Sequence, residues 1–302
     1  MTNKFTGMRS ALILLLTATI WGVAFVAQSV GMDYIEPFTF NGVRSLIGAL
    51  TLVPCIYFMK GNTKKLSAQD KVVSRKMLIQ GGVVCGILLC IASSLQQIGL
   101  MYTTAGKAGF LTTFYIIIVP LFGLIIGKKC TTYTYIGVVL ALVGLYLLSI
   151  KDGFRMEVGD LYILACAVVF ALHILAIDYY APRTDSVKMS CIQFLVSGVI
   201  CMVVAFLFET PELEYILMAK VPVLYAGVMS CGVAYTLQII GQKGMNPTVA
   251  SLILSLESVI AVIAGFFLLQ QALTIRELIG CAVVFVAILL AQLPDKKDKI
   301  KE

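Results

Sequence analysis

The chain has 302 residues, of which 60% are hydrophobic and only 13% are charged, and its mean hydropathy is +0.97. A soluble domain has closer to half apolar and a quarter charged residues, so this chain has too few polar side chains to cover a surface in water. The net charge of +7 does not indicate a nucleic-acid partner, because the basic residues gather in short connections between apolar runs, as in membrane proteins.

Apolar runs long enough to cross a bilayer follow one another along the whole chain. A crossing helix needs about 20 apolar residues. The first run, from Ala11 to about Met32, is too long for the apolar part of a cleaved signal peptide, so we expect it to be retained. In chain order the predicted spans are 11–31, 38–59, 77–101, 106–127, 132–150, 159–180, 187–208, 221–242, 247–269 and 275–293.

The distribution of Lys and Arg predicts the orientation of these spans. With the N-terminus inside, the inner connections and both chain ends carry 17 basic residues, and the outer connections carry 5. Six of the inner ones lie in the longest connection, 60–76, which is too short for a second domain. The positive-inside rule therefore predicts that both ends of the chain face the cytoplasm.

A short motif recurs in the two halves of the chain. Leu95–Gly99 (LQQIG) in the third span returns as Leu237–Gly241 (LQIIG) in the eighth, and at the same offset Tyr115 meets Glu257. We interpret residues 1–150 and 151–302 as two five-helix repeats, the second with a short basic tail. Because five is odd, the second repeat must be inverted relative to the first. The predicted fold is all-α and integral to the membrane, with ten transmembrane helices in two inverted-topology repeats, which is typical of secondary transporters.

The nine cysteines do not indicate a metal or disulfide site. Their number is odd, they lack any Cys-x-x-Cys spacing, and nearly all lie inside apolar runs. We expect them to be small packing residues, and we predict neither a metal nor another cofactor.

Several segments resemble the drug/metabolite transporter (DMT) superfamily, in particular its EamA-type permeases. These segments are Trp21-Gly22, Arg44, Leu95–Lys107 (LQQIGLMYTTAGK), Ala108–Pro120 (AGFLTTFYIIIVP) and Leu256-Glu257. The resemblance covers essentially the whole chain. It implies a ten-helix carrier in a bacterial-type plasma membrane, often an exporter of amino acids or related metabolites. The chain departs from the family pattern at Ser258, where members often have proline.

Two charged residues inside predicted spans are candidates for function, because burying a charge in lipid is costly. Glu257, near the middle of the ninth span, is a candidate for contact with a substrate amine or for proton coupling. A structural role between helices is the alternative. Arg44, in the second span, can pair with Glu257, bind a substrate carboxylate or extend toward the outer surface. Their repeat counterparts are Tyr115 and Gln193, so the two charges break the two-fold pattern.

Uncharged polar and aromatic residues complete the predicted site. Gln96 and Gln238 occupy matching positions in the two repeats, and either line a cavity or form hydrogen bonds between helices. The remaining candidates for substrate binding are Trp21, Gln28 and Tyr115. His173, the single histidine, is either a hydrogen-bonded core residue or part of a proton path.

Pro54 and Pro120 lie inside spans and are candidate hinges. The function that we predict is secondary active transport, in the direction of export, of small organic metabolites such as amino acids, by alternating access at a midplane site and without enzymatic activity. An intramembrane enzyme and a channel or lipid flippase are the alternatives. The expected partners are the substrate and membrane lipid, with no nucleic acid, and a homodimer remains an open option.

Overall fold

The structure, a computed structural model, describes residues 2–58, 68–103, 105–128, 130–149, 157–270 and 274–291. All regular structure in these ranges is helical. The helices of the first half are α1 (Thr2–Gly31), α2 (Pro37–Phe58), α3 (Ala68–Leu100), α4 (Ala105–Thr112), α5 (Tyr115–Ile125) and α6 (Thr132–Ser149). Those of the second half are α7 (Val158–Tyr180), the 3-10 turn η2 (Ala181–Arg183), α8 (Ser186–Phe208), α9 (Leu213–Met218), α10 (Lys220–Leu224), the π-helical η3 (Tyr225–Ala234), α11 (Tyr235–Gln242), α12 (Pro247–Leu254), α13 (Leu256–Leu269) and α14 (Ile275–Ala291).

These helices form the crossings that the apolar runs predict. Eight described segments are long and apolar enough to cross a membrane, and Thr132–Leu147 is a shorter apolar helix. α14, with 17 residues, is at the lower limit of length for a crossing. Three crossings are composite: α4 continues as α5, α10 as η3 and α11, and α12 as α13. Large apolar side chains such as Leu12, Phe206 and Phe267 are exposed, as expected where lipid is the solvent. The all-α membrane fold with ten helices is therefore confirmed.

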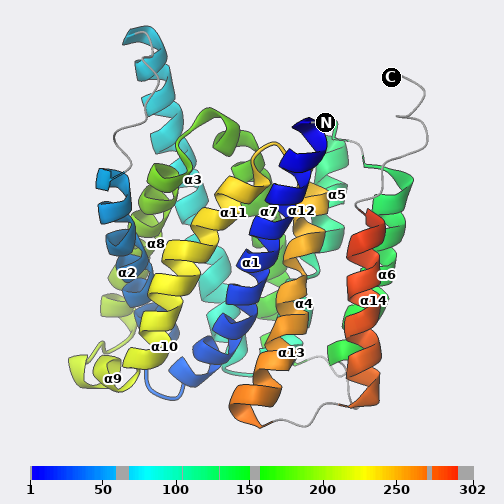
Figure 1. Ribbon diagram of the computed structural model, residues 1–302. Coiled ribbons are helices and arrows are strands. Elements are labelled where there is room, and N and C mark those ends of the chain that lie inside the picture. The colour runs from blue at the N-terminus through cyan, green and yellow to red at the C-terminus, as the bar shows by residue number, and fades with distance from the viewer. Residues whose placement is uncertain are drawn as a thin grey trace.

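α1 begins and α14 ends on the same side of the bundle, at the top of Figure 1. The short α9 lies on the opposite side, between the end of α8 and the start of α10. Five crossings separate the start of α1 from the start of α7. The second half therefore runs through the bundle in the direction opposite to the first.

The contacts between the two halves follow a two-fold pattern. Helices that occupy the same place in each half pack against each other, α2 against α8 and α6 against α14. The remaining contacts are exchanged: α1 packs against α11 and α13 of the second half, and α7 packs against α3, α4 and α5 of the first. Most helix contacts between the halves therefore occur in pairs, in which the two halves exchange the helices that they contribute.

Glycines allow the closest of these approaches. A Cβ atom added at Gly99 of α3 would lie 2.9 Å from the backbone oxygen of Gly159 of α7, and one added at Gly159 would lie 2.9 Å from the oxygen of Gly99. Between α6 and α14, a Cβ at Gly144 would lie 2.8 Å from the backbone nitrogen of Val284. Close backbone contact of this kind drives helix association where lipid removes the hydrophobic effect.

The helix interruptions lie away from the two prolines that we predicted as hinges. α2 continues through Pro54 and α5 continues through Pro120, so their role as hinges stays a prediction. The crossings are instead interrupted at Thr113–Phe114, between α4 and α5, and at Ser255, between α12 and α13. These positions match in the two repeats. No proline marks either interruption.

Two ion pairs hold the fourth crossing against α7. Lys107 at the start of α4 contacts the fully buried Asp160 in the first turn of α7, with 2.6 Å between Nζ and Oδ2. Lys128, just after α5, contacts Asp178 near the other end of α7. The crossing is thus fastened to α7 at both faces of the bundle.

Parts of the sequence predictions fall on residues that the structure does not describe. They are the repeat boundary at residue 150, residues 60–67 of the charged connection 60–76, the basic residues Lys129, Lys151 and Arg155, and the basic tail after Ala291.

Gly144→Ala should destabilise the protein by roughly 1–3 kcal/mol, because the added methyl group overpacks the contact with the backbone of α14. Gly123→Ala is the matched control, since its Cβ would meet only the Lys128 side chain at 3.8 Å. The control should be neutral or gain up to about 1 kcal/mol from helix propensity. Thermal unfolding in detergent measures both. Equal melting temperatures for the two variants would contradict this view of the α6–α14 contact.

Candidate functional site

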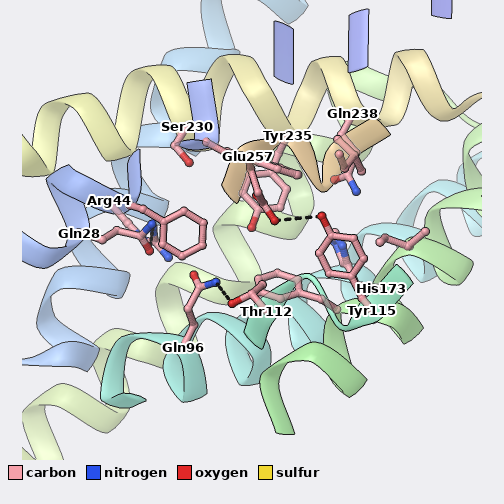
Figure 2. Close-up of a pocket in the computed structure, with 15 residues that line it drawn as sticks. Gln28, Arg44, Gln96, Thr112, Tyr115, His173, Ser230, Tyr235, Gln238 and Glu257 are labelled. Atoms are coloured by element: carbon pink, nitrogen blue, oxygen red, sulfur yellow. Dashed lines mark hydrogen bonds between the residues drawn. The ribbon is translucent and has the colours of Figure 1, made fainter. Parts of the chain in front are cut away.

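A pocket lies in the seam between the two halves, and Figure 2 shows its lining. Its empty volume is about 470 Å³, mouth included. The structure brings every candidate residue for binding or proton coupling to this one pocket. They are Trp21, Gln28, Arg44, Gln96, Tyr115, His173, Gln238 and Glu257. The first five come from the first half and the last three from the second.

Glu257 is held at the interruption of the ninth crossing. It lies in the first turn of α13, and its Oε1 accepts a hydrogen bond of 2.9 Å from the hydroxyl group of Tyr115, in the first turn of α5. The residue is 5% exposed. In the described part of the chain, Tyr115 is its one hydrogen-bond partner. Positions related by a two-fold axis touch only near that axis, so this contact lies at the centre of the seam.

Two further contacts hold the backbone around Glu257. A Cβ at Gly22 of α1 would lie 2.7 Å from the backbone oxygen of Glu257, so only glycine lets α1 approach this closely. Ser258 donates a hydrogen bond of 2.9 Å from Oγ to the backbone oxygen of Gly109 in α4. Ser258, which stands where members of the resembled family often have proline, therefore links the two interrupted crossings.

Arg44 lies at one end of the group of side chains in Figure 2, beside Gln28. Nη1 donates a hydrogen bond of 2.9 Å to Oε1 of Gln28, and the guanidinium group lies 5.5 Å from the ring centre of Phe40. Arg44 is 4% exposed, so the alternative in which it extends to the outer surface is wrong. It forms no ion pair with Glu257 among the described residues. Both charges face neutral partners.

The aromatic members of the site pack against one another. The rings of Trp21 and Tyr235 lie 4.5 Å apart, and the ring of His173 lies 6.0 Å from that of Tyr235. His173 is fully buried and its Nε2 lies 3.2 Å from Oε1 of Gln193, the repeat counterpart of Arg44. The histidine is thus a hydrogen-bonded residue that also faces the pocket.

The two glutamines at matching positions behave differently. Gln96 donates a hydrogen bond of 3.1 Å to the hydroxyl group of Thr112, which ties α3 to α4. The Oε1 atom of Gln238 has no partner in the described structure. The sequence left open whether these glutamines line a cavity or form hydrogen bonds between helices. Gln96 does both.

Several lining residues escaped the sequence analysis as site residues. They are Phe25, Phe170, Ile174, Ser230 and Leu254, and the pocket is also lined by Thr112 and Tyr235. Phe25 was the most accessible to prediction, because it shares a helix face with Trp21 and Gln28. Ser230 lies in η3, whose wider π-helical turn changes the face that each side chain presents, so α-helical spacing could not place it.

Unsatisfied polar atoms surround the pocket. Buried atoms without a partner in the described structure include Nε1 of Trp21, Nε of Arg44, Nδ1 of His173 and Oε1 of Gln238. Leaving such an atom unpaired costs about 1–3 kcal/mol. The pocket therefore offers donors and an acceptor, beside one carboxyl and one guanidinium group, to a polar ligand. No cluster of three or more metal-ligating side chains occurs in the described ranges.

The hydrogen bond between Tyr115 and Glu257 should appear as a coupling energy. In a double-mutant cycle with Tyr115→Phe and Glu257→Leu, each of which removes the hydrogen bond, we expect a coupling on the order of 0.6–1.7 kcal/mol, the range found for hydrogen bonds between membrane helices. Unfolding free energies of the four proteins in mixed micelles give this value. A parallel cycle with Tyr115→Phe and Gln28→Leu, two residues with no hydrogen bond between them in the described ranges, should give none. Equal results from the two cycles would rule out the contact.

Comparison with known proteins is consistent with this geometry. The EamA-like transporter family matches residues 8–150 and again residues 157–293. A protein of Archaeoglobus fulgidus named an uncharacterized transporter is 30% identical over 93% of this chain and 84% of its own length. The uncharacterized transporter YoaV of Bacillus subtilis is 24% identical over 93% of this chain and 96% of its own.

A solved crystal structure with 17% sequence identity superposes with a TM-score of 0.76, over 94% of this chain and 96% of that one. At this identity the similarity concerns the fold alone. The two family matches together cover nearly the whole chain, and the A. fulgidus relative aligns along most of its length. The chain therefore belongs to the EamA-like transporter family, within the drug/metabolite transporter superfamily.

Proposed function

We propose that this transporter is a secondary active carrier that exports small organic metabolites such as amino acids, by alternating access to the pocket between its halves. The observation that carries the proposal is the presence of Arg44 and Glu257 in one buried pocket without an ion pair between them. A buried charge in a membrane protein usually pairs with another charge or contacts a transported solute.

A zwitterion matches the charges of the pocket. Its carboxylate can accept hydrogen bonds from the guanidinium group of Arg44, whose Nε has no partner within the described ranges. Its ammonium group can donate to Glu257. The ring of Trp21 and its neighbour Tyr235 offer an aromatic wall for the rest of the solute. Gln28, Gln96 and Gln238 supply further polar contacts.

The exchanged contacts between the halves support alternating access. In transporters with inverted repeats, the solute binds near the bilayer midplane at the repeat interface, next to discontinuous helices. Here the interruptions at Thr113–Phe114 and at Ser255 lie within two residues of Tyr115 and Glu257. We assign residues 1–150 and 151–302 to the two repeats that exchange conformations.

We propose that Glu257 also couples transport to protons. Its carboxyl group lies in a pocket that a solute must enter, so protonation and solute binding compete for the same oxygens. His173 faces the same pocket but contacts Gln193 rather than a carboxyl group, so we assign it at most a secondary part in a proton path.

The proposed orientation places both chain ends in the cytoplasm of a bacterial-type plasma membrane. The described basic residues near the side where α1 begins include Arg9, Arg75, Lys76 and Lys128, and the opposite side has fewer. A homodimer stays compatible with this orientation.

Zwitterionic amino acids should stabilise the purified protein, and derivatives that lack one charge should not. At 100 times its Kd, a ligand that binds only the folded state adds about 2.7 kcal/mol of stability. We would measure thermal unfolding with amino acids, their methyl esters and their N-acetyl forms. Arg44→Gln should abolish the preference for the free carboxylate over the ester. Equal stabilisation by all three forms would contradict the proposed recognition.

Glu257→Gln should remove the dependence of transport on a pH gradient. The amide is similar in size and still accepts a hydrogen bond from Tyr115, but it cannot exchange a proton. Counterflow and gradient-driven transport of a stabilising amino acid in proteoliposomes measure this effect. Glu214→Gln, on the exposed face of α9, serves as the control. If Glu257→Gln transports normally with unchanged pH dependence, the coupling role is wrong. Unsaturable flux would instead favour a channel.

A further inference from the structure

Two cysteine thiols meet inside the bundle, and neither cysteine is among the residues that line the pocket. Sγ of Cys90 in α3 lies 3.4 Å from Sγ of Cys201 in α8, and both residues are buried. One cysteine belongs to each half, and 111 positions separate them in the sequence. The sequence analysis interpreted all nine cysteines as packing residues, because spacing along the chain cannot show this contact.

Glycines on α3 bring the two backbones together. Gly82, Gly86 and Cys90 follow one another at four-residue intervals, so they share one face of the helix. A Cβ added at Gly86 would lie 2.8 Å from the backbone oxygen of Gln193 in α8. Eight residues further along α8, the Cys201 side chain reaches the position opposite Cys90. The closeness of the thiols thus follows from packing along the whole helix pair.

The surroundings of the thiol pair are polar and border the pocket. Ser94 Oγ lies 3.8 Å from Sγ of Cys201. The buried Ser197 lies one helical turn before Cys201 on α8. Arg44, a pocket residue, lies on α2, which packs closely against α8. By contrast Cys85, also on α3, lies in an apolar cluster with Ile177 and Met189.

We propose that Cys90 and Cys201 form a redox modification site, at which a peroxide oxidises the two thiols to a disulfide that joins the halves of the transporter. A disulfide requires a sulfur separation of about 2.05 Å, so the sulfur atoms must approach by a little more than 1 Å.

In this reaction the two thiols lose two protons and two electrons, and a sulfur–sulfur bond forms. With hydrogen peroxide as oxidant, the oxygen–oxygen bond breaks and two water molecules leave. Oxidation proceeds through a sulfenic acid on one cysteine, which condenses with the neighbouring thiol. Hydrogen peroxide is small and uncharged, so it can enter a buried polar region. A thiol-containing reductant reverses the reaction by exchange.

The disulfide would fix the separation of α3 and α8 beside Arg44. Both helices carry major contacts of the seam between the halves. The oxidised protein therefore contains a covalent link across the interface that alternating access has to rearrange. This inference concerns two side chains that are not among the proposed solute contacts, and it does not depend on the identity of the solute.

Peptide mapping of the full-length protein in lipid nanodiscs tests the site. The protein is treated with hydrogen peroxide, its free thiols are alkylated, and its peptides are analysed by mass spectrometry. We expect a peptide that links Cys90 to Cys201 and the loss of alkylation at both residues. Cys85→Ser should give the same linked peptide. Cys201→Ser should give none, and its Cys90 should remain alkylated.

Thermal unfolding provides a second readout that needs no substrate. Oxidation should raise the apparent melting temperature of the wild type and of Cys85→Ser, and dithiothreitol should restore the original value. Cys201→Ser, and Cys90→Ala as an independent variant, should show no shift. The absence of the linked peptide, a link from Cys201 to Cys231 instead, or a shift that persists in Cys201→Ser would each overturn the proposal.

Discussion

The arrangement of the site depends on the hydrogen bond between Tyr115 and Glu257. The two residues occupy equivalent positions in the repeats, each in the first turn of a helix that follows an interruption. Their contact requires the two interrupted crossings to meet near the pseudo-two-fold axis. Once these crossings meet there, the neighbouring helices of both halves must surround the same space. The pocket is a consequence of this geometry.

Small residues and polar residues have different structural roles in this bundle. Glycines such as Gly22, Gly99 and Gly144 set the distances between helices, because nothing larger fits against the opposing backbone. The polar side chains are concentrated where the seam opens. Several of their atoms lack partners in the described structure, although most buried polar groups in proteins have them. A bundle selected for stability alone would replace these groups by apolar ones, so their retention indicates a function that involves binding.

The sequence predicts the spans, and it also predicts the polar members of the site, for a simple physical reason. Against a background of apolar residues, Glu257, Arg44 and the glutamines are costly, so each one stands out without any structural knowledge. Phe170 and Leu254 did not stand out, because an apolar residue that lines a pocket looks like any other core residue. The interruption at Ser255 and the contact between Cys90 and Cys201 depend on tertiary packing. No proline and no spacing reveals them.

The ion pair of Lys107 could not be predicted from its position in the sequence. A lysine at the end of a span is expected to reach water, but this one contacts Asp160, which is fully buried. Together with Lys128 and Asp178, it fastens the fourth crossing to α7 at both ends. The corresponding pair in the other half is the ninth crossing and α1, and α1 contains no acidic residue. If the two repeats were equivalent, the two end states of the proposed alternating access would have equal free energies. In the described ranges the ion pairs occur at only one of the two related helix contacts, so the two end states of that proposed cycle would differ in free energy.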